Sequence, residues 1–177
     1  MKDTRSYHFT EFNTPMGAFS VAVDSDGAVA ATAFGDERAL GGRLRGADLV
    51  RDTNRTAAAR SQLEEWFLGK RRDFSLELSL GGTLFQRRVW DAVRRIPYGQ
   101  TRSYLDVARV VGSSPRAVGR ANATNPACLV VPCHRVVGSD GSLTGYAFGE
   151  ETKGLLLEFE ASRFGTPNGR LRSYSAA

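Results

Sequence analysis

The sequence predicts an α+β protein whose N-terminal part is α/β and whose C-terminal part is helical. The chain has 177 residues, of which 41% are apolar and 24% charged, enough to bury a packed core. Before Gly81-Gly82 the apolar residues alternate with a period of two, whereas after it they recur every 3.6 residues. We therefore expect an α/β domain over residues 1–82, a helical domain over 83–165 and a loose tail over 166–177.

The N-terminal part is predicted to begin with a small antiparallel meander. Short β-rich runs occur at residues 7–9, 19–23 and 29–34. Turn signals at Pro15-Met16-Gly17 and at residues 24–27 separate them. Residues 35–53 are interpreted as a loop or a weak strand. A helix is expected after Asn54 and ends near Gly69, and the strict alternation of residues 74–80 predicts a strand with one buried face.

The C-terminal part is predicted to be helical apart from one extended run. The first helix covers about residues 85–96 and is stopped by Pro97. Two short helices over residues 103–111 and 115–123 flank a turn at 112–114, an arrangement typical of a helix-turn-helix. An extended run at 129–132 follows. The last helix covers residues 150–164, and four of its side chains are expected to face the core: Leu155, Leu156, Phe159 and Phe164.

The positive charge is concentrated in one region of the chain. The net charge is +5, but residues 1–82 carry 11 basic and 12 acidic side chains (net −1), whereas residues 83–135 carry 9 and 2 (net +7). Of the 24 basic residues 21 are arginine, the side chain best suited to phosphate, although a GC-rich genome gives the same excess. Because codon usage does not explain the clustering, residues 83–135 are predicted to bind a polyanion.

Neither a membrane span nor a secretory leader is expected. No stretch approaches about 18 uncharged apolar residues, and the start of the chain lacks the apolar run of a signal peptide. The sequence is interpreted as intracellular, in the cytoplasm. Its two cysteines, Cys128 and Cys133, have a spacing that fits neither a redox motif nor a zinc site. We expect free thiols, no metal site and no cofactor.

The residues most indicative of chemistry are Pro132-Cys133-His134-Arg135. A cysteine reacts as its thiolate, and a neighbouring histidine or cation lowers the thiol pKa. Neighbouring side chains in a regular strand point to opposite faces, so contact between Cys133 and His134 requires Pro132 to break the extended geometry or a water to bridge them. A lone buried cysteine is more often an inert small hydrophobe, but the combination favours a nucleophile.

This motif, with Val136, resembles the active-site signature of the O6-alkylguanine-DNA alkyltransferases, also called methylated-DNA–protein-cysteine methyltransferases. The resemblance continues in further motifs: Gly82-Thr83-x-Phe85-Gln86-x-x-Val89-Trp90, Ile96-Pro97-Tyr98-Gly99, Ser103-Tyr104, Arg116-Ala117-Val118-Gly119, Asn125-Pro126, Gly145-Tyr146, Lys153 and Leu156-Leu157-x-Phe159-Glu160. It covers about residues 61–164 and is loose over residues 1–60. It implies a ribonuclease-H-like α/β domain followed by a winged-helix-like domain that contains the helix-turn-helix.

The resemblance also implies the reaction, an irreversible single transfer of an alkyl group from O6 of guanine in DNA to the cysteine. Cys133 is then the acceptor, and His134 takes its proton through a water. Glu160 orients His134, and the Tyr104 hydroxyl assists the leaving base. Asn125 joins the recognition helix to the active-site strand. From the residues alone, the preferred interpretation of Glu160 is an ordinary solvated helix residue, and Tyr104 is equally a core tyrosine.

Double-stranded DNA is the partner that the resemblance implies, bound through the minor groove with the target base flipped out. The expected DNA-binding residues are Arg116, Tyr104, Ala117, Gly119, Arg120, Ala121 and Asn122. Arg116 replaces the flipped base in the stack. Small side chains keep the second helix thin, which equally suits packing on a neighbouring helix. A monomer is expected, and cooperative assembly on DNA is left open.

The pocket for the flipped base is expected to be formed by Tyr146, Ala147, Phe148, Val136 and Pro132. Phe148 departs from the family, which usually has small residues in this loop. It either narrows the pocket or stacks on the extruded base, and the sequence does not decide between them. Two other classes are weighed: a non-catalytic binder of damaged DNA, whose members replace the cysteine, and a cysteine hydrolase or redox sensor, which needs no basic surface.

Overall fold

The computed structural model describes residues 5–164 of the chain. Its N-terminal half is built on a four-stranded sheet with the order β3-β2-β1-β4. The strands are β1 (Ser6–Thr14), β2 (Gly17–Val23), β3 (Val29–Phe34) and β4 (Asp48–Arg51). The first three form the antiparallel meander that the sequence predicts, and β4 pairs in parallel with β1. The predicted tail over residues 166–177 lies outside the described residues.

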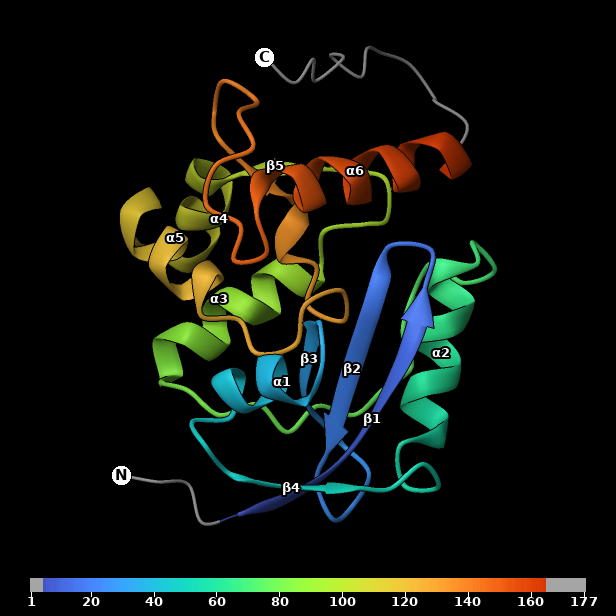
Figure 1. The fold of residues 1–177 in the computed structure, drawn as a ribbon. Coiled ribbons are helices and arrows are strands. Elements are labelled where there is room, and N and C mark those ends of the chain that lie inside the picture. The colour runs from blue at the N-terminus through green and yellow to red at the C-terminus, as the bar shows by residue number, and fades with distance from the viewer. Residues whose placement is uncertain (1–4, 165–177) are drawn as a thin grey trace.

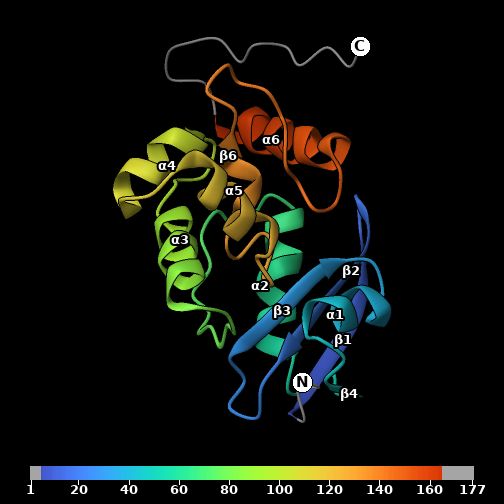
Figure 2. The ribbon, with the colours of Figure 1, turned by 90° about the vertical axis from the view of Figure 1, so that its left-hand side faces the viewer.

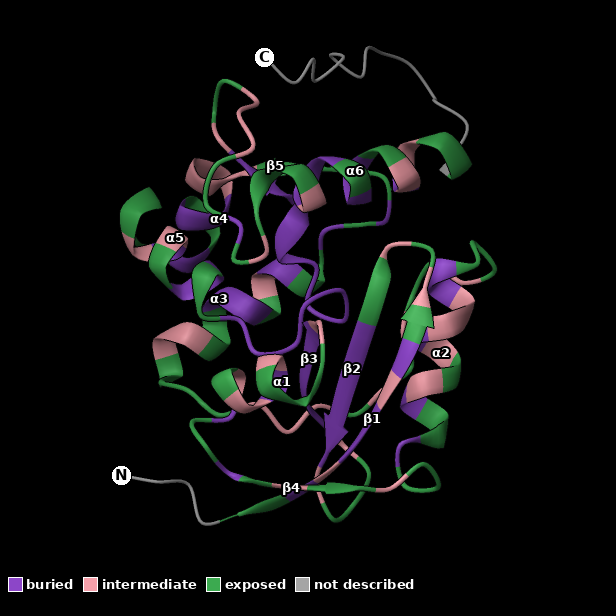
Figure 3. Cartoon of the chain, in the orientation of Figure 1, coloured by how far each residue is buried: buried purple, intermediate pink, exposed green. Residues whose placement is uncertain are grey.

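Helices α1 (Glu37–Arg43) and α2 (Ala57–Phe67) cover opposite faces of the sheet (Figures 1 and 2). Alternation along β2 explains this, because neighbouring side chains of a strand point to opposite faces. Val21 packs in the same cluster as Leu63 of α2, whereas Ala22 packs in the cluster of Leu40 of α1. The sheet is therefore buried on both sides. Figure 3 shows the buried residues along β2 and β3.

Two N-terminal expectations need correction. The loop or weak strand expected over residues 35–53 contains both α1 and β4, and the Asp36 side chain caps α1 by accepting from the backbone of Arg38 and Ala39. The expected strand over residues 74–80 forms only one isolated bridge, between Leu78 and Val29. Over residues 74–78 the side chains are still half-buried and exposed in turn, so the pattern identified the inward face there without a continuous ladder of hydrogen bonds.

The C-terminal half is helical as predicted, with the helices α3 (Leu84–Arg94), α4 (Tyr104–Val111), α5 (Pro115–Ala123) and α6 (Glu150–Phe164). Reciprocal capping between Thr83 and Gln86 starts α3. Ser114 caps α5, and Gly112 adopts the left-handed conformation that ends α4. The predicted helix-turn-helix pair is thus formed by α4 and α5. A two-stranded parallel sheet, β5 (Arg102–Ser103) and β6 (Val136–Val137), joins the start of α4 to the segment after Cys133.

The expected buried face of α6 is partly wrong. Leu155 is 49% exposed, whereas Leu156 is fully buried and Phe159 packs against the core. The side chain of Phe164 lies outside the described residues. The inward face of α6 also carries Lys153 and Glu160, both fully buried. A prediction that uses apolar residues alone therefore places the buried face of α6 at a different angle around the helix from the face that is actually buried.

The two halves of the molecule share one buried cluster. It contains Leu63 and Trp66 of α2 together with Val89 and Val93 of α3. Across this cluster, Thr32 of β3 donates its hydroxyl to the backbone carbonyl of Cys128 at 2.6 Å. The sheet therefore supports the segment that leads to Cys133. Within residues 5–164, no helix is both long and apolar enough to cross a membrane.

We predict that Thr32→Val destabilises the protein by about 1–3 kcal/mol, because the buried Cys128 carbonyl loses its hydroxyl donor. Urea unfolding monitored by tryptophan fluorescence measures the change. Thr32→Ser is the matched control because it retains the hydroxyl. Equal destabilisation by both substitutions would contradict the assigned role of the hydrogen bond.

Candidate active site

Cys133 is the first residue of a one-turn 3₁₀ helix, η1 (Cys133–Arg135), placed between α5 and β6. The extended run expected over residues 129–132 is not formed, because residues 129 and 130 form a turn in which Leu129 has φ 70°. Pro132, with φ −78° and ψ 65°, continues this irregular backbone, so Cys133 and His134 do not lie on a regular strand. The backbone N–H of Cys133 donates to the carbonyl of Val131 at 2.7 Å. Cys133 is 5% exposed, and both it and Cys128 are free thiols, as predicted.

His134, the next residue, is fully buried against Glu160 of α6. Its Nε2 lies 2.7 Å from Oε1 of Glu160. Arg135 donates to the same carboxylate through Nε, at 3.1 and 3.0 Å, and through Nη2 at 2.8 Å. The backbone N–H of Gly99 donates to Oε2 at 3.0 Å. The predicted contact between His134 and Glu160 is therefore present, and Glu160 is not a solvated helix residue.

The Glu160 carboxyl is ionised at neutral pH. Burial by itself raises its pKa, but the charge and hydrogen bonds of His134 and Arg135 outweigh burial and lower the pKa to about 2. Since an ionised carboxylate only accepts hydrogen bonds, the proton between it and the imidazole lies on Nε2 of His134.

The opposite ring nitrogen, Nδ1 of His134, is buried and has no hydrogen-bond partner among the described residues. Burial lowers the pKa of His134, Glu160 raises it, and Arg135 and Lys153 lower it again, so that it lies below the ordinary value of 6.5. The imidazole is therefore neutral at neutral pH, with Nε2–H donated to Glu160 and a lone pair on Nδ1. Such a group is a general base.

The thiol of Cys133 is protonated in this structure. Burial raises its pKa, and a hydrogen bond from Asn125 together with the charges of Lys153 and Arg43 opposes this shift only in part. The expectation that its neighbours stabilise a thiolate is thus not met in the resting protein, because desolvation of the sulfur exceeds the effect of the nearby cations. A base must remove the proton when the thiol reacts.

Two asparagines connect the end of α5 to the thiol. Asn125 donates from Nδ2 to the Val131 carbonyl at 2.9 Å and accepts from the Ala127 N–H at 3.0 Å. Asn122 donates from Nδ2 to the carbonyl of Cys133 itself at 3.2 Å. Because Asn122 belongs to α5, a displacement of this helix is transmitted directly to the turn that holds Cys133.

The α5 residues expected at DNA divide into two groups. Arg116 and Arg120 are exposed, and Ala117 and Gly119 are partly exposed. Ala121 and Asn122 are buried on the inner side of the helix, where the Ala121 carbonyl accepts from the Trp90 indole at 2.8 Å. The outer face of α5 is accordingly thin and carries two arginines, while its inner face contacts α3 and the active-site turn.

Tyr104 begins α4 and faces the loop before α6. Its hydroxyl donates to the carbonyl of Thr144 at 2.7 Å, and that carbonyl also accepts from Nζ of Lys153 at 3.0 Å. A Cβ added to Gly145 would meet the Tyr104 hydroxyl at 2.7 Å, so only glycine permits this approach. The Tyr104 hydroxyl, which the sequence analysis expects to assist the leaving base, is thus hydrogen-bonded to the loop before α6 in this structure.

The expected pocket residues lie on either side of this loop. Pro132 and Val136 are buried, Ala147 is exposed, and the buried hydroxyl of Tyr146 has no hydrogen-bond partner among the described residues.

The ring of Phe148 packs against Phe34 of β3 and against Tyr146, with centroid distances of 5.4 and 5.8 Å. The Arg43 guanidinium lies 4.7 Å from its centroid. Phe148 therefore anchors the loop to the N-terminal half.

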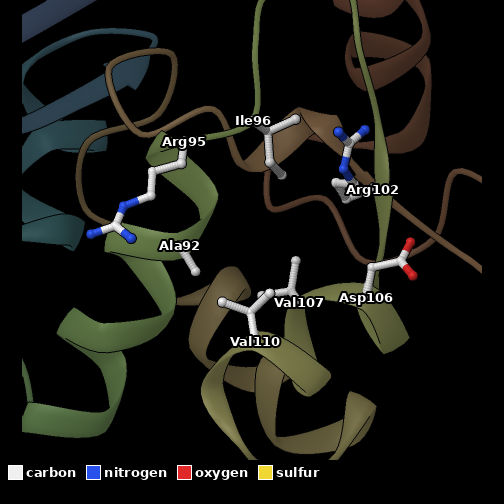
Figure 4. Close-up of a pocket in the computed structure, with 7 residues that line it drawn as sticks. All are labelled: Ala92, Arg95, Ile96, Arg102, Asp106, Val107 and Val110. Carbon is white, nitrogen blue, oxygen red and sulfur yellow. The ribbon is translucent and has the colours of Figure 1, made fainter.

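A pocket of about 470 Å³ lies between α3 and α4. Figure 4 shows the residues that line it. Its floor is apolar, formed in part by Ile96, Val107 and Val110, and Arg95 and Arg102 border it. None of the predicted site residues lines this cavity, so it is separate from the site around Cys133.

Four further residues contact the site. The sequence analysis names Arg135 and Lys153 within motifs but gives them no role, and it names neither Trp66 nor Arg43 as a site residue. Arg135 donates to Glu160, Lys153 is fully buried near Cys133, and Trp66 of α2 packs on His134. Arg43 of α1 donates to the carbonyls of Ala123 and Asn125 at 3.5 and 3.4 Å. Arg135 and Lys153 left local signals, because Arg135 adjoins His134 and Lys153 lies seven residues before Glu160, on the same helical face. The other contacts depend on tertiary packing.

Comparison with known proteins identifies the family. The model of the DNA-binding domain of 6-O-methylguanine DNA methyltransferase matches residues 84–162. A constitutive methylated-DNA–protein-cysteine methyltransferase of Bacillus subtilis is 51% identical over 113 residues, which cover 62% of this chain and 68% of the relative. The corresponding protein of Mycobacterium tuberculosis is 49% identical over 114 residues, covering 63% and 69%.

Solved structures agree over nearly the whole chain. The O6-methylguanine methyltransferase of Mycobacterium tuberculosis superposes with a TM-score of 0.78 at 37% identity, covering 93% of this chain and 96% of that one. Its complex with DNA gives a TM-score of 0.78, covering 88% and 94%. Fold and site together define a class of mixed α+β, DNA-binding proteins with a buried cysteine, histidine and glutamate. The chain belongs to the methylated-DNA–protein-cysteine methyltransferase family.

We predict that the Glu160 carboxylate stabilises the fold in a pH-dependent manner. Since its pKa is about 2 in the folded protein against 4.5 ordinarily, its contribution is complete above pH 4.5 and is lost as the pH falls toward 2. The loss is on the order of 3 kcal/mol. In Glu160→Gln, unfolding free energies measured between pH 5 and 2 should lack this component, and the variant should be about 3–5 kcal/mol less stable at pH 7.

The control is Glu158→Gln, an exposed carboxylate on the same helix, which should retain the acid-dependent loss. A Glu160→Gln variant as stable as the unmodified protein at pH 7 would contradict the assigned ion pairs.

Proposed function

We propose that this protein repairs O6-alkylguanine in DNA by transferring the alkyl group irreversibly to Sγ of Cys133, one group per protein molecule. The arrangement of Cys133, His134 and Glu160 carries this proposal: a buried neutral imidazole, hydrogen-bonded to Glu160 and with no partner for Nδ1 among the described residues, directly follows a buried protonated thiol in the chain. The names of the relatives, methylated-DNA–protein-cysteine methyltransferases, support the same chemistry.

The reaction conserves atoms and charge as follows. His134 takes the thiol proton at Nδ1 through a water, and the Glu160 carboxylate stabilises the resulting imidazolium. The sulfur forms a bond to the alkyl carbon while the bond from that carbon to guanine O6 breaks. The leaving guanine receives a proton or a hydrogen bond as its negative charge develops. The product is a thioether, which contains no hydrolysable bond, so the protein is consumed.

Tyr104 is the proposed donor to the leaving base. Its hydroxyl is held by the Thr144 carbonyl, but that carbonyl has a second donor in Lys153. Tyr104 can therefore turn toward a bound base without leaving a carbonyl unpaired. The backbone of Tyr146 and Ala147 is proposed to hold the base, in a pocket completed by Pro132 and Val136.

DNA is proposed to bind through the minor groove on the outer face of α5. The exposed Arg116 at the start of this helix would occupy the space of the flipped nucleotide, and Arg120 would contact phosphate. The small side chains of Ala117 and Gly119 permit close approach. A solved relative from Mycobacterium tuberculosis is described in complex with DNA, which supports this partner. We propose a monomer as the reacting species, with cooperative assembly on DNA as a further property to measure.

The finer fold assignment belongs to the same proposal. Residues 1–82 are proposed as a ribonuclease-H-like domain, which the meander with its parallel fourth strand supports. Residues 83–165 are proposed as a winged-helix-like domain that contains α4 and α5.

The central test is the stoichiometry of transfer. Incubated with excess duplex that carries O6-methylguanine, the protein should accept one methyl group, located on the Cys133 peptide by mass spectrometry. Cys133→Ser should abolish transfer and retain DNA binding, whereas Cys128→Ser, at a buried thiol whose pKa burial raises to about 12, should transfer normally. Sustained turnover would overturn the proposal, and so would intact lesion DNA bound to an unmodified Cys133.

The role of Arg116 is tested separately. Arg116→Ala should react nearly normally with the free base O6-methylguanine, but about tenfold or more slowly with the lesion in duplex DNA, since a flipped nucleotide costs a few kcal/mol. Arg120→Ala, exposed one turn later, is the control and should weaken duplex binding without this selective loss. An equal loss of Arg116→Ala activity on both substrates would assign Arg116 a structural role instead.

A further inference from the structure

Three packed aromatic rings, those of Trp66, Tyr98 and Phe159, lie beside the buried hydrogen bond between His134 and Glu160. Trp66, in the last turn of α2, is fully buried, and its ring meets the His134 imidazole edge-on at a centroid distance of 6.3 Å and an interplanar angle of 74°. Trp66 also packs on Tyr98 at 6.2 Å and on Phe159 at 5.0 Å. The rings come from α2, from the segment after α3 and from α6. We call these three packed rings the aromatic wall; Trp66 is the ring that meets the imidazole.

Trp66 is the member of this wall that belongs to the N-terminal half. Its indole Nε1 is buried and has no hydrogen-bond partner among the described residues. An unpaired buried donor costs free energy, so the ring is not retained for a hydrogen bond. What Trp66 supplies is apolar surface, placed on the imidazole and on Phe159, the residue next to Glu160.

We infer that Trp66 is a positioning residue for alkyl transfer: it fixes the imidazole plane of His134 and keeps water from the bond between Nε2 and Glu160, so that Nδ1 remains the proton acceptor. The inference rests on the proposed function, because it assigns a task to the base of that reaction. It also gives the N-terminal half, which lacks the nucleophile, a direct part in the chemistry.

The groups around His134 determine how its pKa changes when the Trp66 ring is removed. Glu160 on α6 raises its pKa, whereas Arg135 in η1 and Lys153 on α6 lower it. Tyr98 contributes a neutral phenol, since burial raises its pKa above the ordinary value, and Cys133 in η1 contributes a neutral thiol. Burial is the largest influence and lowers the pKa of His134. Water admitted in place of Trp66 weakens that influence while Glu160 stays 2.7 Å away, so the pKa of His134 should rise.

The test uses the full chain with Trp66→Leu, Trp66→Phe and, as control, Leu63→Ala. Leu63 is equally buried one turn earlier in α2, so its loss removes core volume from the same helix at a different place. The chain contains two histidines, so two imidazole signals are expected in the NMR spectrum, and His8→Gln assigns them. The pKa of His134 is read from its ring protons, and the rate of alkyl transfer to Cys133 is measured against pH.

We expect Trp66→Leu to raise the pKa of His134 by about one unit. Since the base acts in its neutral form, the acid limb of the plot of transfer rate against pH should move to higher pH by the same amount. At pH values below the pKa of His134 in the unmodified protein, the variant should therefore transfer the alkyl group about tenfold more slowly. Trp66→Phe keeps an aromatic face and should restore most of the unmodified profile. Leu63→Ala should lower the melting temperature and leave the titration unchanged.

Two results would overturn the inference: an unmodified titration in Trp66→Leu, or the same shift in Leu63→Ala. Neither depends on the proposed reaction, because the NMR titration needs no substrate. Failure of the unmodified protein to alkylate Cys133 would instead refute the proposed function.

Discussion

The ionised carboxylate of Glu160 organises the C-terminal half of this protein. It accepts hydrogen bonds from three donors in two segments distant from it in sequence: the backbone of Gly99, and the side chains of the adjacent residues His134 and Arg135. A buried charge without such partners is strongly unfavourable, so the three donors and the carboxylate must be brought together for the core to form. Stability and chemistry thus depend on one group, which fixes both the tautomer of the imidazole and the position of η1.

The N-terminal half supports this arrangement at several points, each with a different interaction. Thr32 bonds to the Cys128 carbonyl, Arg43 contacts the end of α5 and the Phe148 ring, and Trp66 packs on His134. The N-terminal half, through its sheet and both of its helices, therefore contacts the segment before Cys133, the end of α5 and the imidazole of His134. Its own residues carry almost no net charge, in agreement with a supporting role rather than one at a polyanion.

Local patterns in the sequence predicted most of the elements and the candidate site, because those depend on residues near one another in the chain. The period change at Gly81-Gly82 marked the start of the helical half, and Pro132-Cys133-His134-Arg135 marked the site. The inward face of α6 was misplaced because Lys153 and Glu160 occupy core positions that apolar periodicity overlooks. The role of Phe148 was undecided since its neighbours, Phe34 and Arg43, lie more than a hundred residues earlier.

Burial of a protonated thiol is a suitable resting state for the single irreversible transfer proposed above. A neutral buried thiol reacts slowly with oxidants and with alkylating agents, both of which attack thiolates. If the charges of Lys153 and Arg43 outweighed burial, the sulfur would be ionised in the resting protein. Oxidants and free alkylating agents would then consume it before it met its substrate. Here the thiolate forms only when His134 accepts the proton. Asn122 and Asn125 join the turn of Cys133 to α5, so the helix proposed to meet DNA also controls when that sulfur is presented.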